Sequence, residues 1–387
     1  MTNQSLSKLH KFIAPALLTV FFLSEAYGKY VIWYFRDKSD VAKWIKLAIM
    51  AAAFSLCLKY WKSLKIFLVL TVIFFLGQWT ITNGFQQEII VSFGKFLFPL
   101  VLFLYFNKNP LNSEGYKWLF KAFEILILVN SLLIVIGFLF EVPLFKTYRY
   151  DNRFGYDGLM IVSATATYVY SIACFYFLVR LKDKFLTHWK SLFFILSLLL
   201  LGTKSAYLCL FVSLIVYVVF YLKISKTAKI ILLIAGSLLA MVVFYIFFFQ
   251  WGLFNEIRQA EGFLTSLLST RDKAFMEVTW PFIQQEWSWL NYFVGGINDL
   301  STRSQMGVVD VFFIWGIVGG IIYLYSYYKS FVIFKTNKVV SILMVTLFVL
   351  IFLSGNFFEN ASIAIYMLVL QGVFSQEDQL KQKYDAH

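Results

Sequence analysis

Apolar runs recur from one end of the chain to the other, and they constrain the fold more than any other feature. Most are about 20 residues long, the length that a helix needs to cross the hydrocarbon core of a bilayer. Backbone groups in hydrocarbon must be bonded within their own segment, so closely spaced runs are expected to be helices and not barrel strands. Two runs, 187–201 and 360–374, are short, which leaves ten or eleven crossings with a re-entrant segment as the alternative. We expect about twelve spans, at 12–35, 41–58, 66–82, 89–106, 119–140, 159–179, 187–201, 205–222, 230–249, 308–328, 339–354 and 360–374.

The composition requires a bilayer as solvent. Apolar residues make up 60% of the 387 positions and charged residues 14%, and the mean hydropathy is +0.74. An ordinary globular protein is about 45 to 50% apolar, so a soluble enzyme is excluded. The cysteines Cys57, Cys174 and Cys209 fall inside apolar runs without metal spacing, and we interpret them as small hydrophobic residues. The predicted fold class is an all-α polytopic membrane protein.

The distribution of basic residues predicts the orientation. Lysines are concentrated in alternate connections, such as 59–65, 180–190 and 223–229, whereas the connections between them hold fewer. Because positively charged connections stay in the cytoplasm, we expect both termini inside. The formal charge of +13 is then mostly a topology signal, and its scatter over short loops argues against a nucleic-acid partner.

One outer segment is much longer than the others. It predicts a division into helices one to nine at 1–249, a periplasmic loop at 250–307, and three further helices with a short cytoplasmic tail at 308–387. The helical spacing of Ile257, Ala260, Leu264 and Leu267 predicts an amphipathic helix in this loop. A second helical stretch, 271–278, is expected to end near Pro281.

Arginine is gathered on the expected outer side, where the positive-inside tendency disfavours it. Guanidinium groups suit phosphate or carboxylate oxygens, so the group predicts an anion site. The alternative for any one of them is solvation or a pair with a nearby acid. Lys204, at a tight outer turn, either reaches the same anion or extends its amine toward the interface. The outer arginines are Arg149, Arg153, Arg258, Arg271 and Arg303.

An outer general base cannot be histidine in this sequence, because His10, His188 and His387 all fall on the predicted cytoplasmic side. A carboxylate must then take any proton. Asp310 opens a helix at the membrane boundary and is either that base or a helix cap. Asp299, after the pair Gly295 and Gly296, is the second candidate and equally fits an inert loop acid. We find no metal spacing, phosphate-binding loop or dinucleotide fingerprint.

Three further features have ordinary structural interpretations. Glu25 and Lys29 lie four residues apart in the first span and could neutralise each other. Lys95 is placed within the fourth span, where an ionisable group is either functional or paired. The third is a small-residue face that is typical of close helix packing, formed by Gly316, Gly319 and Gly320.

Several short motifs, in order, resemble those of the O-antigen polymerase (Wzy) family, within the wider polymerase and ligase group. Ligases of that group place a histidine in the late loop, and its absence here favours a polymerase. Each motif is degenerate, but their order and their predicted side of the membrane agree. The similar segments are Arg153-Phe154-Gly155, Thr203 to Ala206, Ser269-Thr270-Arg271, Gly295-Gly296, and Asp310 to Phe313 followed by Trp315, Gly316, Ile317 and Gly319.

The resemblance implies a glycosyltransferase of the bacterial inner membrane. Such a protein joins undecaprenyl-diphosphate-linked repeat units at the periplasmic face, for O-antigen, capsule or exopolysaccharide, and needs neither metal nor cofactor. Asp310 or Asp299 would take the acceptor proton. A chain-length regulator is a partner that the resemblance leaves open. The diphosphate would be held by Arg149, Arg153, Arg271, Arg303 and Lys204.

Three other functions remain open on the sequence. A flippase or other transporter of the same lipid-linked unit has a similar number of spans. Lys95 is the best candidate residue for the charged midplane site that a transporter would need. A ligase would differ by the residues of its late loop. A membrane assembly factor without chemistry would leave the outer arginines replaceable.

Overall fold

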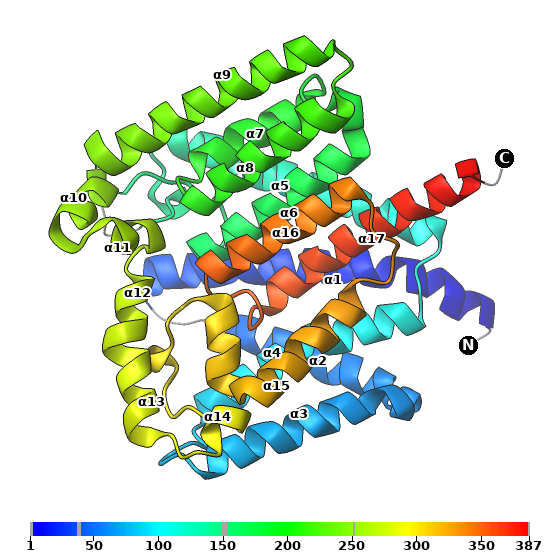
Figure 1. Ribbon diagram of the computed structural model, residues 1–387. Coiled ribbons are helices and arrows are strands. Elements are labelled where there is room, and N and C mark those ends of the chain that lie inside the picture. Colours follow the sequence, from blue (N-terminus) through cyan, green and yellow to red (C-terminus); the bar gives the residue numbers. More distant parts are fainter. Residues whose placement is uncertain (1–2, 37–39, 149–152, 251, 386–387) are drawn as a thin grey trace.

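The computed structural model describes residues 3–36, 40–148, 153–250 and 252–385 (Figure 1). Within these ranges the chain is helical, and its one β-type contact is an isolated antiparallel bridge between Lys146 and Tyr156. The all-α class is thereby confirmed. The bundle consists of α1 (Asn3–Phe35), α2 (Asp40–Cys57), α3 (Trp61–Trp79), α4 (Gln87–Lys108), α5 (Ser113–Leu139), α6 (Ser163–Leu181), α7 (Trp189–Leu200), α8 (Lys204–Val216), α9 (Lys226–Tyr245), α15 (Gly307–Phe331), α16 (Lys338–Leu353) and α17 (Ala361–Asp385).

Each expected apolar run coincides with one of these helices. Eight helical segments of the described chain are long and apolar enough to cross a membrane, with α2, α3 and the short turn η1 (Leu58–Tyr60) forming one of them. The apolar helices α7 and α16 are shorter. The protein is therefore a membrane protein by helix length and composition.

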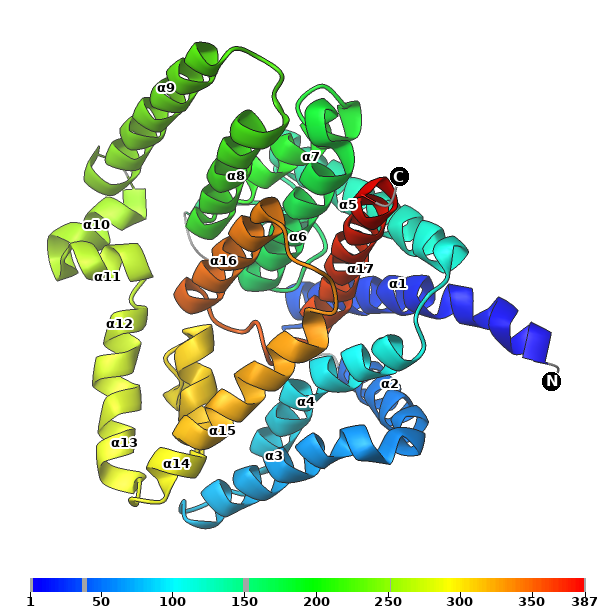
Figure 2. The ribbon, with the colours of Figure 1, turned by 45° about the vertical axis from the view of Figure 1, so that its right-hand side comes forward.

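The helices of the bundle differ sharply in how much protein surrounds them. In α6 every residue from Thr165 to Val179 is buried, and α17 and α8 are among the helices that pack against it. In α9 none of the described side chains is buried, and this helix touches the chain mainly through η4 (Tyr217–Tyr221) and η5 (Ile246–Gln250). Figures 1 and 2 show α9 standing at the margin of the bundle. The side chains of α6 thus form the centre of the core.

The tenth apolar helix, α15, packs through its glycines as expected. A side-chain carbon at Gly319 would lie 2.7 Å from Ile73 of α3. At Gly316 the backbone leaves the helical region, with φ at 64°, and a side-chain carbon there would lie 2.4 Å from the backbone of Phe293. Only glycine fits this close approach, which kinks α15 against the outer segment.

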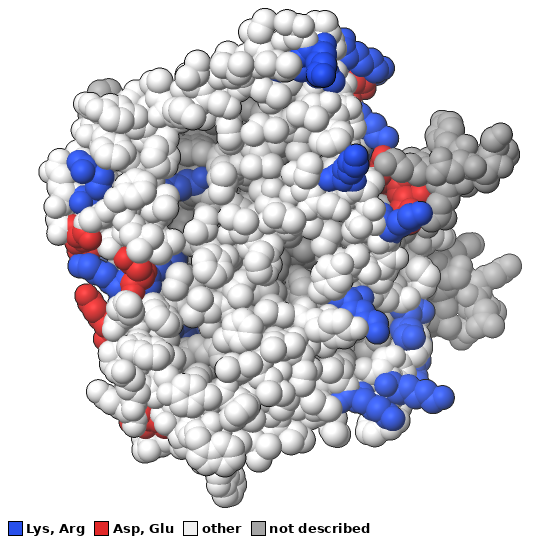
Figure 3. Space-filling view, viewed as in Figure 1, with Lys and Arg blue, Asp and Glu red and all other residues white. Residues whose placement is uncertain are grey.

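The long segment between α9 and α15 forms a column of short helices along one end of the bundle (Figure 2). Other connections, including the α4–α5 and α8–α9 turns, lie at the opposite end with the two termini (Figure 1). In the face drawn in Figure 3 the basic side chains gather at these two ends. The column contains α10 (Gly252–Glu261), α11 (Phe263–Leu268), α12 (Arg271–Lys273), η6 (Ala274–Thr279), α13 (Trp280–Glu286), α14 (Asn291–Val294) and η7 (Leu300–Thr302).

Two details of the predicted loop are wrong. The expected amphipathic helix is broken at Gly262, where φ is 98°, so that Ile257 and Leu264 belong to different helices. The second stretch does not end near Pro281, because η6 leads directly into α13, which runs to Glu286. Pro281 occupies the first turn of α13, where a missing N–H costs least, and the π-type turn before it leaves space for the ring.

The charges of α1 do not pair as expected. Lys29 pairs with Asp157 of the α5–α6 connection. Glu25 pairs with Lys46 of α2 and accepts a hydrogen bond from the hydroxyl of Ser362, 2.6 Å away. Spacing along one helix face shows which groups can meet, but burial between helices decides which partner each one takes.

Candidate active site

A tight contact between two connections brings the first two candidate cations together. The Tyr156 N–H donates to the carbonyl of Leu200, 2.9 Å away. At Gly202 φ is 68°, and a side-chain carbon would lie 2.1 Å from the carbonyl oxygen of Phe154. Glycine is therefore required for the backbone after Arg153 to lie against the turn before Lys204.

Lys204 lies in the first turn of α8 and reaches across to the column of short helices between α9 and α15. Its Nζ donates to the carbonyls of Ser266 at 2.6 Å and Leu267 at 2.9 Å. The same ammonium lies 4.0 Å from the centre of the Phe254 ring. Since an ammonium has three donors, two carbonyl bonds leave one N–H for a further acceptor. Lys204 thus both anchors α11 and retains capacity for an anion.

Arg153 faces the same aromatic ring. Its guanidinium lies 4.8 Å from the ring centre of Tyr148 and 5.4 Å from that of Phe254. Phe254 therefore contacts two cations, Arg153 and Lys204, and attracts both through the electrons of its faces. This arrangement holds two positive charges on one aromatic ring.

Arg271 completes a group of three cations. The chain enters α12 through two left-handed residues, Ser269 and Thr270, with φ of 55° and 65°. The Arg271 side chain is half-buried and donates from Nη1 to the carbonyl of Leu268, 3.2 Å away. Its enclosed Nε has no hydrogen-bond partner among the described residues. This unmatched donor is available to a ligand that enters the site.

The charges of these cations act on one another. Burial holds the pKa of Arg271 below its usual value, and Arg153 acts in the same direction. Tyr168, Tyr148 and Asp310 act in the opposite direction. The charges of Arg271 and Arg153 also reach the ammonium of Lys204. An arginine keeps its charge through such shifts, so the site remains strongly positive.

Asp310 lies in the first turn of α15, and its charge acts on Arg271. Its side chain makes no capping hydrogen bond within the described chain, because the capping position is Met306, but an acid in this first turn is favoured by the helix dipole. Its carboxylate is 2% exposed, and its Oδ1 accepts from the hydroxyl of Ser304 at 2.9 Å. Its Oδ2 is enclosed without a hydrogen-bond partner among the described residues. Ser304 thus holds one oxygen, and the other has no hydrogen bond in the part of the chain that the structure describes and can still accept a proton.

Arg303 and Glu359 form an ion pair beside Asp310. Glu359 also accepts from the hydroxyl of Ser92, 3.3 Å away, and Arg303 Nε donates to the carbonyl of Leu300 at 3.1 Å. The charges of both members act on Asp310. Glu359 is a residue that the sequence reasoning missed; the available signal was an isolated acid in the turn between two apolar helices.

The remaining candidates make other contacts or cannot be placed. Asp299 is exposed, and its Oδ1 accepts from the N–H of Ser301 at 2.7 Å, which lowers the pKa of the carboxyl. Arg258 donates to the carbonyl of Phe248 at 2.9 Å and to the amide of Asn255 at 3.0 Å. Arg149 lies outside the described residues. The structure therefore brings together Arg153, Lys204, Arg271, Arg303 and Asp310.

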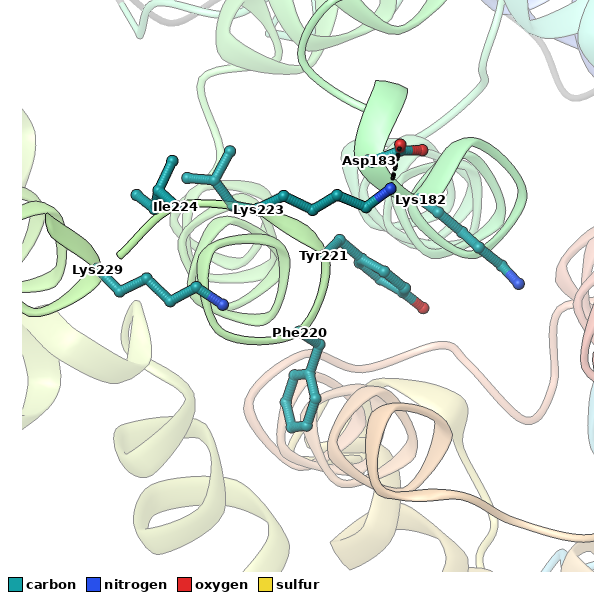
Figure 4. A pocket seen from close by; sticks show the side chains of 8 residues that line it. Lys182, Asp183, Phe220, Tyr221, Lys223, Ile224 and Lys229 are labelled. Carbon is teal, nitrogen blue, oxygen red and sulfur yellow. Dashed lines mark hydrogen bonds and ion pairs between the residues drawn. The ribbon is translucent and has the colours of Figure 1, made fainter. Parts of the chain in front are cut away.

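A pocket of about 420 Å³ lies at the opposite end of the bundle (Figure 4). It is lined by Lys182, Lys223 and Lys229, and Lys223 pairs with Asp183 at 3.4 Å. These lysines belong to the connections that the sequence places in the cytoplasm. This pocket is separate from the cation group. In the described part of the chain, no cluster of three or more metal-ligating side chains is found.

Comparisons with known proteins give no family assignment. No family model matches the chain, and no curated protein or solved structure matches it significantly. What the site does must therefore be argued from its chemistry. Three neighbouring cations favour an anion with several oxygens, and a buried carboxylate with one open oxygen favours a proton transfer next to it.

Proposed function

We propose that this protein is a membrane polysaccharide polymerase that joins repeat units carried on a polyprenyl diphosphate, as the resemblance to O-antigen polymerases implies. The donor is the growing glycan on its undecaprenyl diphosphate, and the acceptor is a sugar hydroxyl of an incoming lipid-linked unit. The product is an O-antigen, a capsule or an exopolysaccharide.

One observation carries the proposal: Arg153, Lys204 and Arg271 share a neighbourhood with the buried carboxylate of Asp310. A diphosphate leaving group gains negative charge as its bond to the sugar breaks. Preorganised cations in a site shielded from water stabilise that developing charge far better than solvent does. A site with cations alone would bind the lipid but would give the acceptor proton no destination.

The reaction needs no further reactant. The acceptor oxygen forms a bond to the anomeric carbon of the donor, while the bond from that carbon to the diphosphate oxygen breaks. Its electron pair remains on the diphosphate, facing Arg153, Lys204 and Arg271. The hydroxyl proton moves to Oδ2 of Asp310, whose Oδ1 is held by Ser304. In this assignment Arg303, bound to Glu359, acts on Asp310 and not on the diphosphate.

The membrane arrangement is part of the same proposal. We place the chain in the bacterial inner membrane with about twelve crossings and both termini in the cytoplasm. Support comes from the column of short helices between α9 and α15, which lies at one end of the bundle (Figure 1). The lipid-linked unit would then reach the cations from the outer leaflet.

A transporter is the main rival, and Lys95 is its best candidate for a midplane site. In the structure the side chain of Lys95 is exposed on α4, whereas the candidate outer residues converge. This favours group transfer at the outer end over movement through the centre. A ligase would share the cation group and differ only in its acceptor.

The test compares matched variants in the native host. Arg153→Ala, Arg271→Ala and Asp310→Asn are expected to leave single repeat units in place of a ladder of polymer at the cell surface. Arg258→Ala is the control for an outer arginine whose donors go elsewhere, and membrane abundance is measured for each variant. A flippase defect would instead leave no repeat unit outside, and a ligase defect would leave long chains on the lipid carrier. Normal ladders in all three variants would refute the site assignment.

A further inference from the structure

A buried ion pair connects the first helix to the outer connection that carries Arg153. The side chains of Lys29 and Asp157 are 4% and 1% exposed. Asp157 lies between α5 and α6, four positions after Arg153. An ionised pair at such depth costs desolvation of both groups, so it calls for an explanation.

Lys29 contacts both ends of this connection, at Lys146 and at Gly158. Besides pairing with Asp157, its Nζ donates to the carbonyl of Gly158 at 2.7 Å and to that of Lys146 at 3.3 Å. Residues 146 and 156 form the isolated bridge, and the Thr147 N–H donates to the carbonyl of Gly155 at 2.9 Å. The ammonium therefore lies at the base of the connection that contains Arg153.

Neutral contacts support the same segment from the other side. The amide of Asn130 donates to the carbonyl of Asp157 at 3.1 Å and accepts from the N–H of Leu159 at 2.8 Å. A side-chain carbon at Gly158 would lie 2.4 Å from the Asn130 oxygen. Removal of Lys29 would thus leave the connection attached, but with one of its two supports lost.

The electrostatics show that the pair is not optimised for stability. Burial raises the pKa of Asp157 to about 6, although Lys29 acts in the opposite direction. Desolvation of the carboxylate therefore outweighs its attraction to the partner. Apolar replacement of a complete buried pair is often neutral or stabilising, whereas removal of one partner leaves an uncompensated charge. A pair of this kind is better explained by the geometry that it fixes.

We infer that Lys29 and Asp157 are positioning residues, which fix the outer connection so that Arg153 faces Lys204 and Arg271. Their role in reaction rests on the proposed function, since it assumes that the three cations hold one diphosphate. The fixed connection itself does not depend on that function, and it can be measured without any substrate.

The experiment uses the full chain in lipid nanodiscs, with Lys29→Met and the apolar double variant Lys29→Met/Asp157→Leu. Hydrogen exchange is followed at the amides of Thr147, Tyr156 and Leu159, and binding is measured with undecaprenyl diphosphate. We expect the double variant to unfold at the wild-type temperature or above. Its exchange at these amides should be at least about tenfold faster, and its binding at least about tenfold weaker.

The matched control is Lys46→Met, which breaks the other ion pair of α1, between Lys46 and Glu25. It should leave exchange of the outer connection unchanged. A double variant with lower thermal stability but wild-type exchange in this segment would show a merely structural role and overturn the inference. If wild-type protein fails to bind the diphosphate lipid while the exchange result holds, the proposed function fails and the positioning of the connection stands.

Discussion

Arg303 and Glu359 form an ion pair that joins the end of the outer column to the turn before α17. Both side chains are nearly buried, at 11% and 12% exposed. Their charges act in opposite directions on the neighbouring carboxylate of Asp310. The candidate base is therefore surrounded by one cation and one anion, whereas three cations are proposed to hold the diphosphate.

The loss of Glu359 should destabilise the protein more than the loss of the whole pair. Glu359→Gln leaves the Arg303 guanidinium without its carboxylate, and we expect a cost of about 3 kcal/mol. The double variant Arg303→Met/Glu359→Gln should recover a large part of this loss. Unfolding in a mild detergent, followed by circular dichroism, measures both. Equal stability of the single and double variants would contradict a coupled pair.

Asp310→Asn should separate binding from turnover. The amide keeps the shape of the side chain and can still accept a hydrogen bond from Ser304. It cannot take the proton of the sugar hydroxyl that attacks the donor. We expect polymerisation by the purified protein to fall by about 10²- to 10⁴-fold, while affinity for the diphosphate lipid stays near wild type. Asp299→Asn is measured in parallel. If the loss of turnover follows Asp299 instead, the base is misassigned.

Gly202→Ala should disturb the site without touching a charged residue. The methyl group would meet the carbonyl of Phe154, and φ of 68° is unfavourable for alanine. We expect a cost of about 1 to 3 kcal/mol. The connection should also shift away from Lys204, weakening lipid binding. Gly236→Ala, in α9 where nothing lies within 4 Å, is the control and should behave as wild type. A wild-type affinity in Gly202→Ala would show that this contact does not align the cations.

Stability should depend on pH through Asp157, which faces Lys29 and Tyr170. Because burial raises the pKa of this carboxyl from 3.8 to about 6, the folded protein binds the proton more tightly than the unfolded chain does. The stabilisation is complete below the unfolded value and is lost as the pH rises to the folded one. We expect ionisation of this group to lower the free energy of unfolding by roughly 3 kcal/mol between about pH 4 and 6. In Asp157→Asn the free energy of unfolding should not fall over this pH range. Identical dependence of that free energy on pH in the two proteins would argue against a role for Asp157.

The sequence was sufficient for the helices because their length is set by the bilayer. The positions of Arg153, Lys204 and Arg271 could also be selected, since cations on the expected outer side are unusual. Their convergence could not be derived, because it depends on how the connection after α5 meets the turn before α8.

Pairing of buried charges was beyond the sequence for a related reason. Helical spacing suggested that Glu25 and Lys29 meet, yet each takes a partner more than fifteen positions away along the chain. Glu359 was overlooked because an acid between apolar helices has no partner until the fold supplies Arg303. The π-type turn before Pro281 likewise has no clear pattern in the residues that form it.

The exposure of α9 suggests a link between the candidate site and the surrounding lipid. Because none of its described side chains is buried, we expect the tilt and depth of this helix to depend on the thickness of the hydrocarbon. Its outer end leads through η5 to α10, which carries the Phe254 ring shared by Arg153 and Lys204. We therefore expect acyl-chain length in the membrane to affect the proposed polymerisation through a helix that carries none of the candidate residues.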